Sequence, residues 1–224
     1  SFGSFHPDVS DFYFKPDGTA VFVTDTTHDY VRRYNMSTAW DITTMSGVID
    51  EYDATSIEAT PRSLAFNDDG SKMYISGTTQ DRIAEVALST PWDVTTATFN
   101  NITSGILTDR DPYSIQFADN GYKLYVLNNY VNAVISYSLS TAYDISTMNV
   151  GGCADWFMPL EPIDLNPKSI YFKPDGTELF FSGHGLDNIY NISLSTAWDL
   201  STGTLNYTLD VSSQTATPYG LTFN

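Results

Sequence analysis

A repeat of about 52 residues constrains the fold of this chain more than any other feature. A Phe-x-x-Asp/Asn-Gly segment occurs four times, and its glycines are 52, 51 and 55 residues apart. Aspartate, asparagine and glycine tolerate the positive φ of tight turns, so each segment predicts a β-hairpin. The four copies are Phe14–Gly18, Phe66–Gly70, Phe117–Gly121 and Phe172–Gly176.

A second motif, Ser-Thr-x-Trp/Tyr-Asp, keeps the same spacing. Two motifs in register indicate one repeated structural unit. In the second unit we expect a single helical turn, with Thr90 as N-cap, Pro91 in the first helical position and Asp93 reaching back to the cap. The four copies are Ser37–Asp41, Ser89–Asp93, Ser140–Asp144 and Ser195–Asp199.

Each unit also predicts four short strands. In the second unit these are 63–66, 72–76, 82–88 and 97–102, and the fourth strand of the last unit is 204–209. No unit contains a periodic helix of useful length, which argues against a helical solenoid. The predicted fold class is therefore all-β, a β-propeller of four-stranded antiparallel blades in a single domain.

The last residues repeat the start of the second unit. Pro218–Asn224 matches Pro61–Asn67, which predicts four complete units followed by a fifth inner strand. This strand could close the ring beside the first unit, pair with a neighbouring chain in a homo-oligomer or filament, or lead into further blades. The predicted units are about 1–58, 59–109, 110–164 and 165–215, with the fifth strand at 216–224.

These motifs carry a family resemblance. The Phe-x-Pro-Asp-Gly turn, the strand Lys-Met-Tyr-Ile-Ser-Gly and the following Asp-x-Ile resemble the blade repeats of YVTN and NHL-type propeller proteins over nearly the whole chain. The Leu-Ser-Thr-x-Trp-Asp segment departs from the usual short connection and lengthens the unit. The resemblance implies a fold and leaves the activity open, because propellers host many functions.

The charge balance excludes one large class of partners. The chain has 27 Asp and Glu residues against 10 Lys and Arg, a net charge of -17, so it repels phosphate backbones and we expect no nucleic-acid partner. No apolar run is long enough for a membrane helix. The low charged fraction of 17% and the single cysteine, Cys153, favour an extracellular, cell-surface or virion-surface location.

The residues just before the inner strands differ between repeats, so they are free to serve a ligand. They converge on the predicted central channel and could form a polar or glycan-binding funnel with aromatic walls. The favoured interpretation is that the cations are ordinary solvated charges on loops, against which the tyrosines pack. The funnel candidates are Arg62, Tyr113, Lys168 and Tyr219.

A ring of oxygen-bearing side chains lies 11 residues past each turn glycine. Carboxylate and amide oxygens suit calcium, so a calcium site is one interpretation, and no other cofactor is expected. The favoured interpretation is that these side chains cap loop N–H groups in every blade. The four residues are Asp29, Asp81, Asn132 and Asp187.

The third unit contains an apolar insertion in which Trp156, Phe157 and Met158 follow one another. Such a run in a variable loop predicts a patch for a protein partner, or else a segment that covers the channel or a blade edge. Four Asn-x-Ser/Thr sequons would accept glycans in a eukaryotic secretory pathway. They begin at Asn35, Asn101, Asn191 and Asn206.

Catalytic motifs are sparse. The histidines are His6, His28 and His184, and the chain has no Gly-x-Ser-x-Gly elbow. Either of the last two could meet an aspartate in space, but a solvated loop histidine is the commoner case. The favoured prediction is a non-enzymatic binding or assembly module, with glycan or protein as its partner. The alternative is a propeller hydrolase or lactonase with a metal ion in its central channel.

Overall fold

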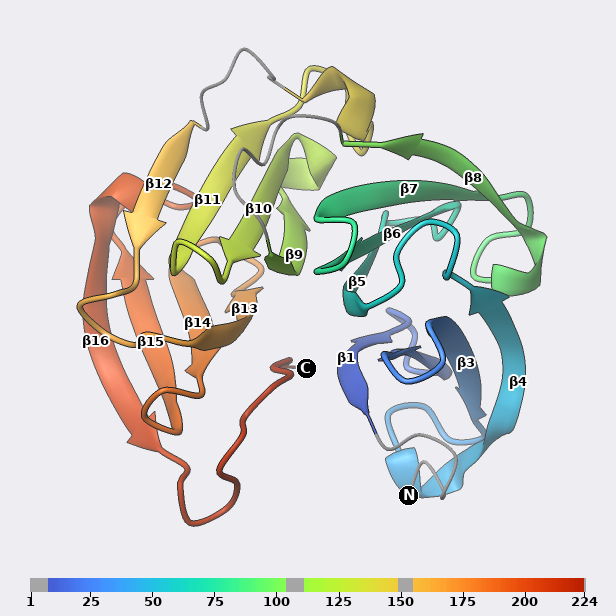
Figure 1. Ribbon diagram of the computed structural model, residues 1–224, viewed down its shortest axis with the longest axis horizontal. Coiled ribbons are helices and arrows are strands. Elements are labelled where there is room, and N and C mark those ends of the chain that lie inside the picture. Colours follow the sequence, from blue (N-terminus) through green and yellow to red (C-terminus); the bar gives the residue numbers. More distant parts are fainter. Residues whose placement is uncertain (1–7, 104–110, 149–154, 224) are drawn as a thin grey trace. The chain divides into compact units, whose positions relative to one another are not determined.

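A computed structural model describes residues 8–103, 111–148 and 155–223. Within these ranges the chain forms four antiparallel four-stranded sheets, each made of consecutive strands (Figure 1). These are the blades of a β-propeller, which confirms the predicted fold class. The chain divides into two compact units, 1–103 with blades 1 and 2, and 104–224 with blades 3 and 4.

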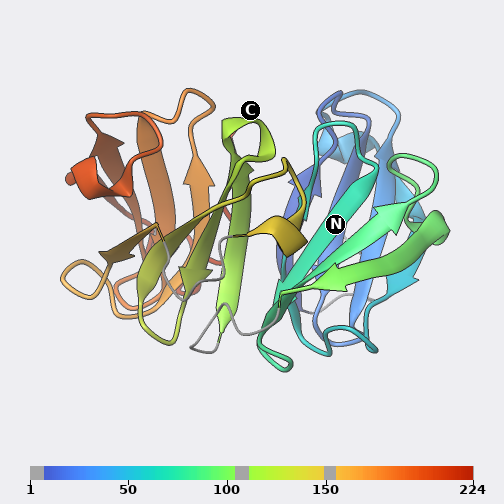
Figure 2. The same cartoon turned by 90° about the horizontal axis from the view of Figure 1, so that it is seen from above.

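The first unit contains eight strands in its described part. Blade 1 is β1 (Val9–Phe14), β2 (Ala20–Asp25), β3 (Tyr30–Met36) and β4 (Met45–Asp53). Blade 2 is β5 (Pro61–Phe66), β6 (Lys72–Gly77), β7 (Arg82–Leu88) and β8 (Ala97–Ile102). Strands that follow one another in the chain lie side by side in both views (Figures 1 and 2).

The described part of the second unit repeats this pattern. Blade 3 is β9 (Pro112–Ala118), β10 (Lys123–Asn128), β11 (Ala133–Ser138) and β12 (Trp156–Pro159). Blade 4 is β13 (Pro167–Phe172), β14 (Glu178–Gly183), β15 (Asn188–Leu194) and β16 (Gly203–Asp210). Five short 3-10 helices are the described helical elements: η1 (Ile42–Thr44), η2 (Val94–Thr96), η3 (Asp119–Gly121), η4 (Ile145–Thr147) and η5 (Leu200–Thr202). None of the described helices is long and apolar enough to cross a membrane.

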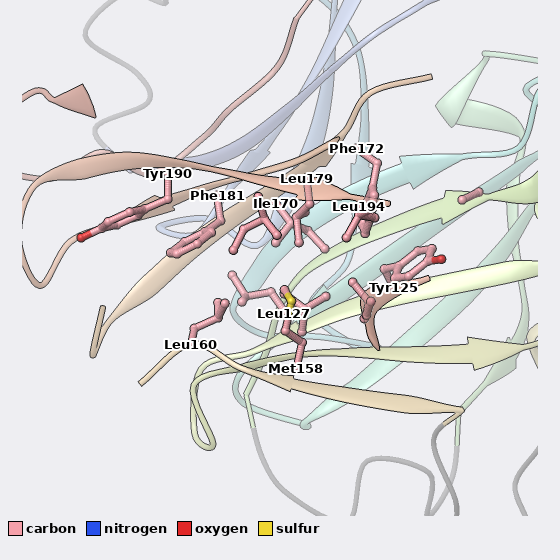
Figure 3. Packing of buried hydrophobic residues seen from close by; sticks show 14 residues of the cluster. Tyr125, Leu127, Met158, Leu160, Ile170, Phe172, Leu179, Phe181, Tyr190 and Leu194 are labelled. Atoms are coloured by element: carbon pink, nitrogen blue, oxygen red, sulfur yellow. The ribbon is translucent and has the colours of Figure 1, made fainter. Parts of the chain in front are cut away.

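Each unit has its own apolar core between its two blades. In the second unit, Tyr125 and Leu127 of β10 and Met158 of β12 face Phe172 and Phe181 of blade 4, and all are buried (Figure 3). In the first unit, Phe22 of β2 packs on Phe66 of β5 with ring centroids 4.7 Å apart. Apolar residues from both blades therefore hold the two blades of each unit together.

The two repeated motifs meet at one end of every blade, which we call the turn end. The N–H of Trp92 donates to the Gly70 carbonyl oxygen at 2.9 Å, and the indole lies over the glycine. The same pairing joins Trp40 to Gly18, Tyr143 to Gly121 and Trp198 to Gly176, each at 2.9 Å. The aromatic residue thus fixes the hairpin turn of its own blade, and this explains why the motifs share one period.

The prediction that Thr90 caps a helical turn is wrong, because the N-cap is Asp93. Trp92 has φ of 64°, which interrupts a right-handed helix, so the chain makes a turn from Thr90 to Asp93 and then the 3-10 helix η2. Asp93 is the N-cap, and its carboxylate accepts from the Thr95 N–H at 3.0 Å. Asp41, Asp144 and Asp199 cap η1, η4 and η5 in the same way.

The predicted fifth inner strand does not form within the described residues, because no strand pairs with 216–223. The segment nevertheless lies against blade 4. Phe223 packs on Tyr171 and Phe180 with centroids 5.1 and 4.7 Å away, and Ser182 Oγ donates to the Tyr219 carbonyl oxygen at 2.9 Å. Phe66 packs on Tyr13 and Phe22 at the same two distances, so these contacts match those of an inner strand.

Candidate active site

The opposite end of each blade carries the loop between its second and third strands, and we call it the loop end. In blade 2, the buried Glu58 comes from the connection that precedes the blade. Its carboxylate accepts from the N–H groups of Thr79 and Thr60, both at 3.0 Å. The side chain occupies the space beside Gly77, where a Cβ would lie 2.3 Å from Glu58 Cγ. Glu58 therefore joins the connection that precedes blade 2 to the loop between β6 and β7 through hydrogen bonds.

In blade 4 an aspartate, Asp164, takes the role that Glu58 has in blade 2. The buried Asp164 accepts from the N–H groups of Gly185 and Leu186 at 3.0 and 3.1 Å, and from the Tyr190 hydroxyl at 3.1 Å. It lies beside Gly183, which again has no side chain in the way. A buried carboxylate with this many donors is satisfied by the loop, and we assign it to structure.

Blades 1 and 3 cap the loop from within the second strand. In blade 1, Asp25 Oδ1 accepts from the N–H groups of Thr27 and His28 at 2.9 and 3.2 Å. Asn128 Oδ1 of blade 3 makes the two corresponding contacts, at 3.0 and 3.1 Å. An amide thus suffices for the capping, and the carboxylate of Asp25 has a second oxygen left for other partners.

The second oxygen of Asp25 orients a histidine. His28 Nδ1 lies 2.9 Å from Asp25 Oδ2, and Arg32 Nη1 contacts the same oxygen. Asp25 is fully buried, whereas the His28 side chain is 48% exposed. Since a carboxylate only accepts, this contact assigns the proton of a neutral His28 to Nδ1 and leaves the lone pair on Nε2. The arrangement can take a proton from a bound water molecule.

The other histidine in the described residues, His184, contacts an amide instead of a carboxylate. His184 lies in the corresponding loop of blade 4, where its Nδ1 is 3.2 Å from Asn166 Nδ2. Of the two loop histidines that could meet an aspartate in space, His28 contacts Asp25 in the structure. The three-residue spacing from Asp25 is the signal that could have singled it out. His6 and Cys153 lie outside the described residues.

Asp11 on β1 is a further polar residue that sequence reasoning missed. Its Oδ2 accepts from Ser63 Oγ at 2.7 Å and from the Leu64 N–H at 3.0 Å, so it joins the inner strands of blades 1 and 2. Burial raises the pKa of Asp11 to about 6, although these hydrogen bonds lower it. An inner-strand acid of this kind has no counterpart in the other blades, which carry Ser63, Ser114 and Ser169 at the same position.

The funnel candidates fall into both units. Tyr113 and Lys168 are buried and lie together, with Lys168 Nζ 4.2 Å from the centre of the Tyr113 ring. Tyr219 is more exposed, and its ring lies 6.3 Å from that of His184. Arg62 belongs to the first unit, where its Nε is 3.5 Å from Thr78 Oγ1. Lys168 is therefore packed on an aromatic ring and is not a solvated loop charge.

The residues considered for calcium share a backbone conformation. Asp29, Asp81, Asn132 and Asp187 have φ of 60°, 54°, 46° and 53°, the left-handed region that aspartate and asparagine tolerate. Three of their carbonyl oxygens accept the N–H that follows the outer strand, as Asp29 does from Ala54 at 2.8 Å. The part of the chain that the structure describes holds no group of three or more His, Cys, Asp or Glu residues arranged for a metal. Calcium binding stays a prediction.

The three residues of the predicted partner patch differ in exposure. Trp156 and Phe157 on β12 are 47% and 45% exposed, whereas Met158 belongs to the core of the second unit. β12 is the outermost strand of its blade, and Trp156 and Phe157 are the accessible part of the predicted patch. A partner for this strand stays a prediction.

The sequons differ in accessibility. Asn191 is buried and its Nδ2 donates to Glu178 Oε2 at 2.9 Å, so a glycan there would break a packed contact. Asn206 is exposed on β16 and donates to Asn191 Oδ1 at 3.0 Å. Asn35 and Asn101 are partly buried, on β3 and β8. Glycosylation stays a prediction, and the exposed Asn206 is the best placed of the four.

A family model named "Lactonase, 7-bladed beta-propeller" matches residues 6–156 of this chain. The chain belongs to this family. A comparison with curated proteins gives no match. The propeller part of the predicted resemblance is confirmed, and the specific YVTN and NHL repeat types are not.

Solved structures show the same fold at low sequence identity. A candidate 6-phosphogluconolactonase of Bacteroides uniformis is 16% identical with a TM-score of 0.56, and the match covers 92% of this chain and 58% of that one. The periplasmic gluconolactonase of Pseudomonas aeruginosa is 16% identical with a TM-score of 0.53, covering 92% and 55%. A nidogen/laminin complex matches at 13% identity with a TM-score of 0.58, covering 97% and 68%. This chain thus spans little more than half the length of the two lactonase-type structures.

The family match corrects one prediction of the sequence analysis. The favoured interpretation, a non-enzymatic binding or assembly module, is wrong, because the matched family is named for lactonases. The alternative that the sequence left open, a propeller hydrolase or lactonase, agrees better with the match. The reason for the error is physical: the sequence has no local catalytic motif, and the contact between His28 and Asp25 joins a strand end to a loop and forms only in the folded chain.

Proposed function

We propose that this chain carries the proton-transfer residues of a lactone hydrolase, with His28 as general base and Asp25 as the residue that positions it. The observation that carries the proposal is the contact of 2.9 Å between His28 Nδ1 and the buried Asp25 Oδ2, combined with the exposure of the His28 ring. A buried carboxylate that orients an accessible imidazole is a recurrent device of hydrolases. Membership in the lactonase family supports the same chemistry.

The reaction follows from the position of the His28 lone pair. Nε2 accepts a proton from a water molecule as the water oxygen attacks the lactone carbonyl carbon, and a tetrahedral intermediate forms. The ring C–O bond then breaks, and the imidazolium returns the proton to the departing alkoxide oxygen. One lactone and one water molecule give one hydroxy acid. Asp25 accepts from Nδ1–H throughout and stabilises the imidazolium, because the two groups then carry opposite charges.

Substitution of the two loop histidines tests the proposal. Hydrolysis of glucono-δ-lactone is followed by acid release at constant pH, and the spontaneous rate is subtracted. His28→Gln removes the base and keeps a polar side chain, so we expect kcat/KM to fall by about 10² to 10⁴. His184→Gln is the matched control, because this histidine lies in the corresponding loop and contacts Asn166 rather than a carboxylate. Equal rates for the two variants would overturn the assignment.

The remaining predictions concern location, metal and assembly. An extracellular or surface location, a metal ion in the channel, and a homo-oligomer built through the last residues stay predictions. Metal analysis of the purified protein tests the second, and mass measurement of the protein truncated after Thr217 tests the third.

A further inference from the structure

The segments that border His28 carry several acidic residues. Asp29 is the next residue in the chain, and its carbonyl oxygen accepts from Ala54, the residue after Asp53. Asp8 joins them through the residue before His28, because Thr27 Oγ1 donates to Asp8 Oδ2 at 2.9 Å. Three acidic residues therefore lie on the segments that border the exposed imidazole.

The arginine at this site is engaged by the protein. Arg32 Nη1 contacts Asp25, and its Nε donates to Glu51 Oε2 at 3.1 Å. Its guanidinium carbon also lies 5.0 Å from the centre of the Tyr30 ring. Arg32 is buried, with two carboxylates and an aromatic face as partners. Its charge is compensated within the protein, and a ligand phosphate would have to displace these partners.

Asp29 lies near two other carboxylates, those of Asp53 and Asp25. Its pKa is raised, first by desolvation and then by the charges of Asp53 and Asp25, while His28 opposes the shift. These influences place Asp53 and Asp25 within electrostatic reach of the same loop. A second negative group brought by a ligand would meet the same repulsion.

On the basis of the proposed function, we propose that the His28 site accepts uncharged lactones and rejects lactones that carry a phosphate or carboxylate group. The hydroxyl groups of a polyhydroxy lactone find acceptors in Asp8, Asp29 and Asp53, whereas an anionic substituent finds carboxylates and an already compensated arginine. These acids determine specificity and take no part in the proton transfer. Charged residues of this kind act through repulsion of the wrong substrate.

Two substrates that differ by one phosphate test the inference. We compare glucono-δ-lactone with its 6-phosphate, at low ionic strength and at 0.5 M salt, where screening shortens the reach of exposed charges to a few ångströms. We expect kcat/KM to favour the uncharged lactone by at least about tenfold at low ionic strength, and the ratio to shrink with salt. Asp53→Asn should also lower the ratio.

Asp17→Asn serves as the control for net charge. Asp17 lies at the turn end of the same blade, beside Lys15, so this variant changes the total charge by the same amount far along the strands from His28. We expect its substrate ratio to equal that of the wild type. Preference for the phosphorylated lactone, or a ratio that neither salt nor Asp53→Asn alters, would overturn the inference alone. Hydrolysis of neither lactone above the spontaneous rate would overturn the proposed function and the inference with it.

Discussion

The indole ring of Trp92 lies over Gly70, and its backbone N–H donates to the Gly70 carbonyl oxygen at 2.9 Å. A Cβ on Gly70 would lie 2.1 Å from Trp92 Cε2, and the glycine has φ of 71°. The two repeated motifs of the sequence are therefore the two halves of one contact, and neither forms the turn end of a blade alone.

Gly70→Ala is expected to destabilise blade 2. Its left-handed conformation costs an alanine roughly 1 to 2 kcal/mol. Displacement of the indole adds to this, since overpacking typically costs about 1 to 3 kcal/mol. Urea unfolding measures the loss. Gly47→Ala is the control, because a Cβ there meets no atom within 4 Å. Equal midpoints for the two variants would show that the Trp92 contact contributes nothing.

Asp93 and Thr90 separate the two interpretations of the Ser-Thr-x-Trp-Asp motif. The Asp93 carboxylate accepts from the N–H and the hydroxyl of Thr95 at 3.0 and 2.6 Å. Thr90 contributes its backbone, which accepts from Asp93 N–H at 3.1 Å and donates to Thr96 Oγ1 at 3.1 Å. Asp93→Ala should cost about 1 kcal/mol as the loss of an N-cap, and Thr90→Ala less. Thermal melting checks the order, and the reverse order would restore Thr90 as the cap.

Much of this architecture is readable from the sequence, and the reasons are local. The turn glycines and the alternating strands follow from positive φ and from two-residue periodicity, so the four blades are predicted, and the strand bounds predicted for the second unit lie within two residues of those observed. The cap at Asp93 is missed because Trp92 adopts φ of 64° to reach Gly70, a tertiary contact that overrides the local helical signal. The fifth strand is missed because a strand needs a pairing partner as well as a strand-like sequence.

The candidate site is harder to predict from the sequence than the fold. Asp25 looks like any residue at the end of a strand, and Asn128 takes its place in blade 3 for the capping role. What distinguishes Asp25 is its second oxygen, and this becomes visible only when the loop returns His28 to it and β3 brings in Arg32. Three residues within eight positions therefore form a cluster that no linear motif describes.

Asp11 predicts a specific pH dependence. Its pKa is raised to about 6 from a usual value of 3.8, so its contribution to stability is present below pH 4 and is lost as pH rises through 6. This difference of about 2 pKa units corresponds to at most about 3 kcal/mol. Unfolding free energies from pH 4 to pH 7 measure the change. Asp11→Asn should remove this part of the decline with pH, and an unchanged pH profile would contradict the burial of a titrating carboxyl.

Substitution of Asp164 measures how much a loop-end carboxylate contributes to the free energy of unfolding. Asp164→Ala leaves the N–H groups of Gly185 and Leu186 and the Tyr190 hydroxyl without their acceptor. Hydrogen bonds to a charged group contribute about 1.5 to 3 kcal/mol each, so we expect a loss of at least 2 kcal/mol in urea unfolding. Glu161→Ala on the same connection is exposed and should change stability by less than about 0.5 kcal/mol. Similar losses of stability for the two variants would show that Asp164 has no special structural role.

The central claim is that His28 is the base of a lactone hydrolase, and chemical rescue tests it most directly. His28→Ala leaves space beside Asp25 for a free imidazole molecule, which can take the same contact with Oδ2. Hydrolysis of glucono-δ-lactone by this variant, corrected for hydrolysis in imidazole buffer alone, should rise with imidazole concentration to saturation, while the wild type and His184→Ala stay constant. An His28→Ala variant that is fully active without imidazole, or that imidazole does not rescue, would contradict the account.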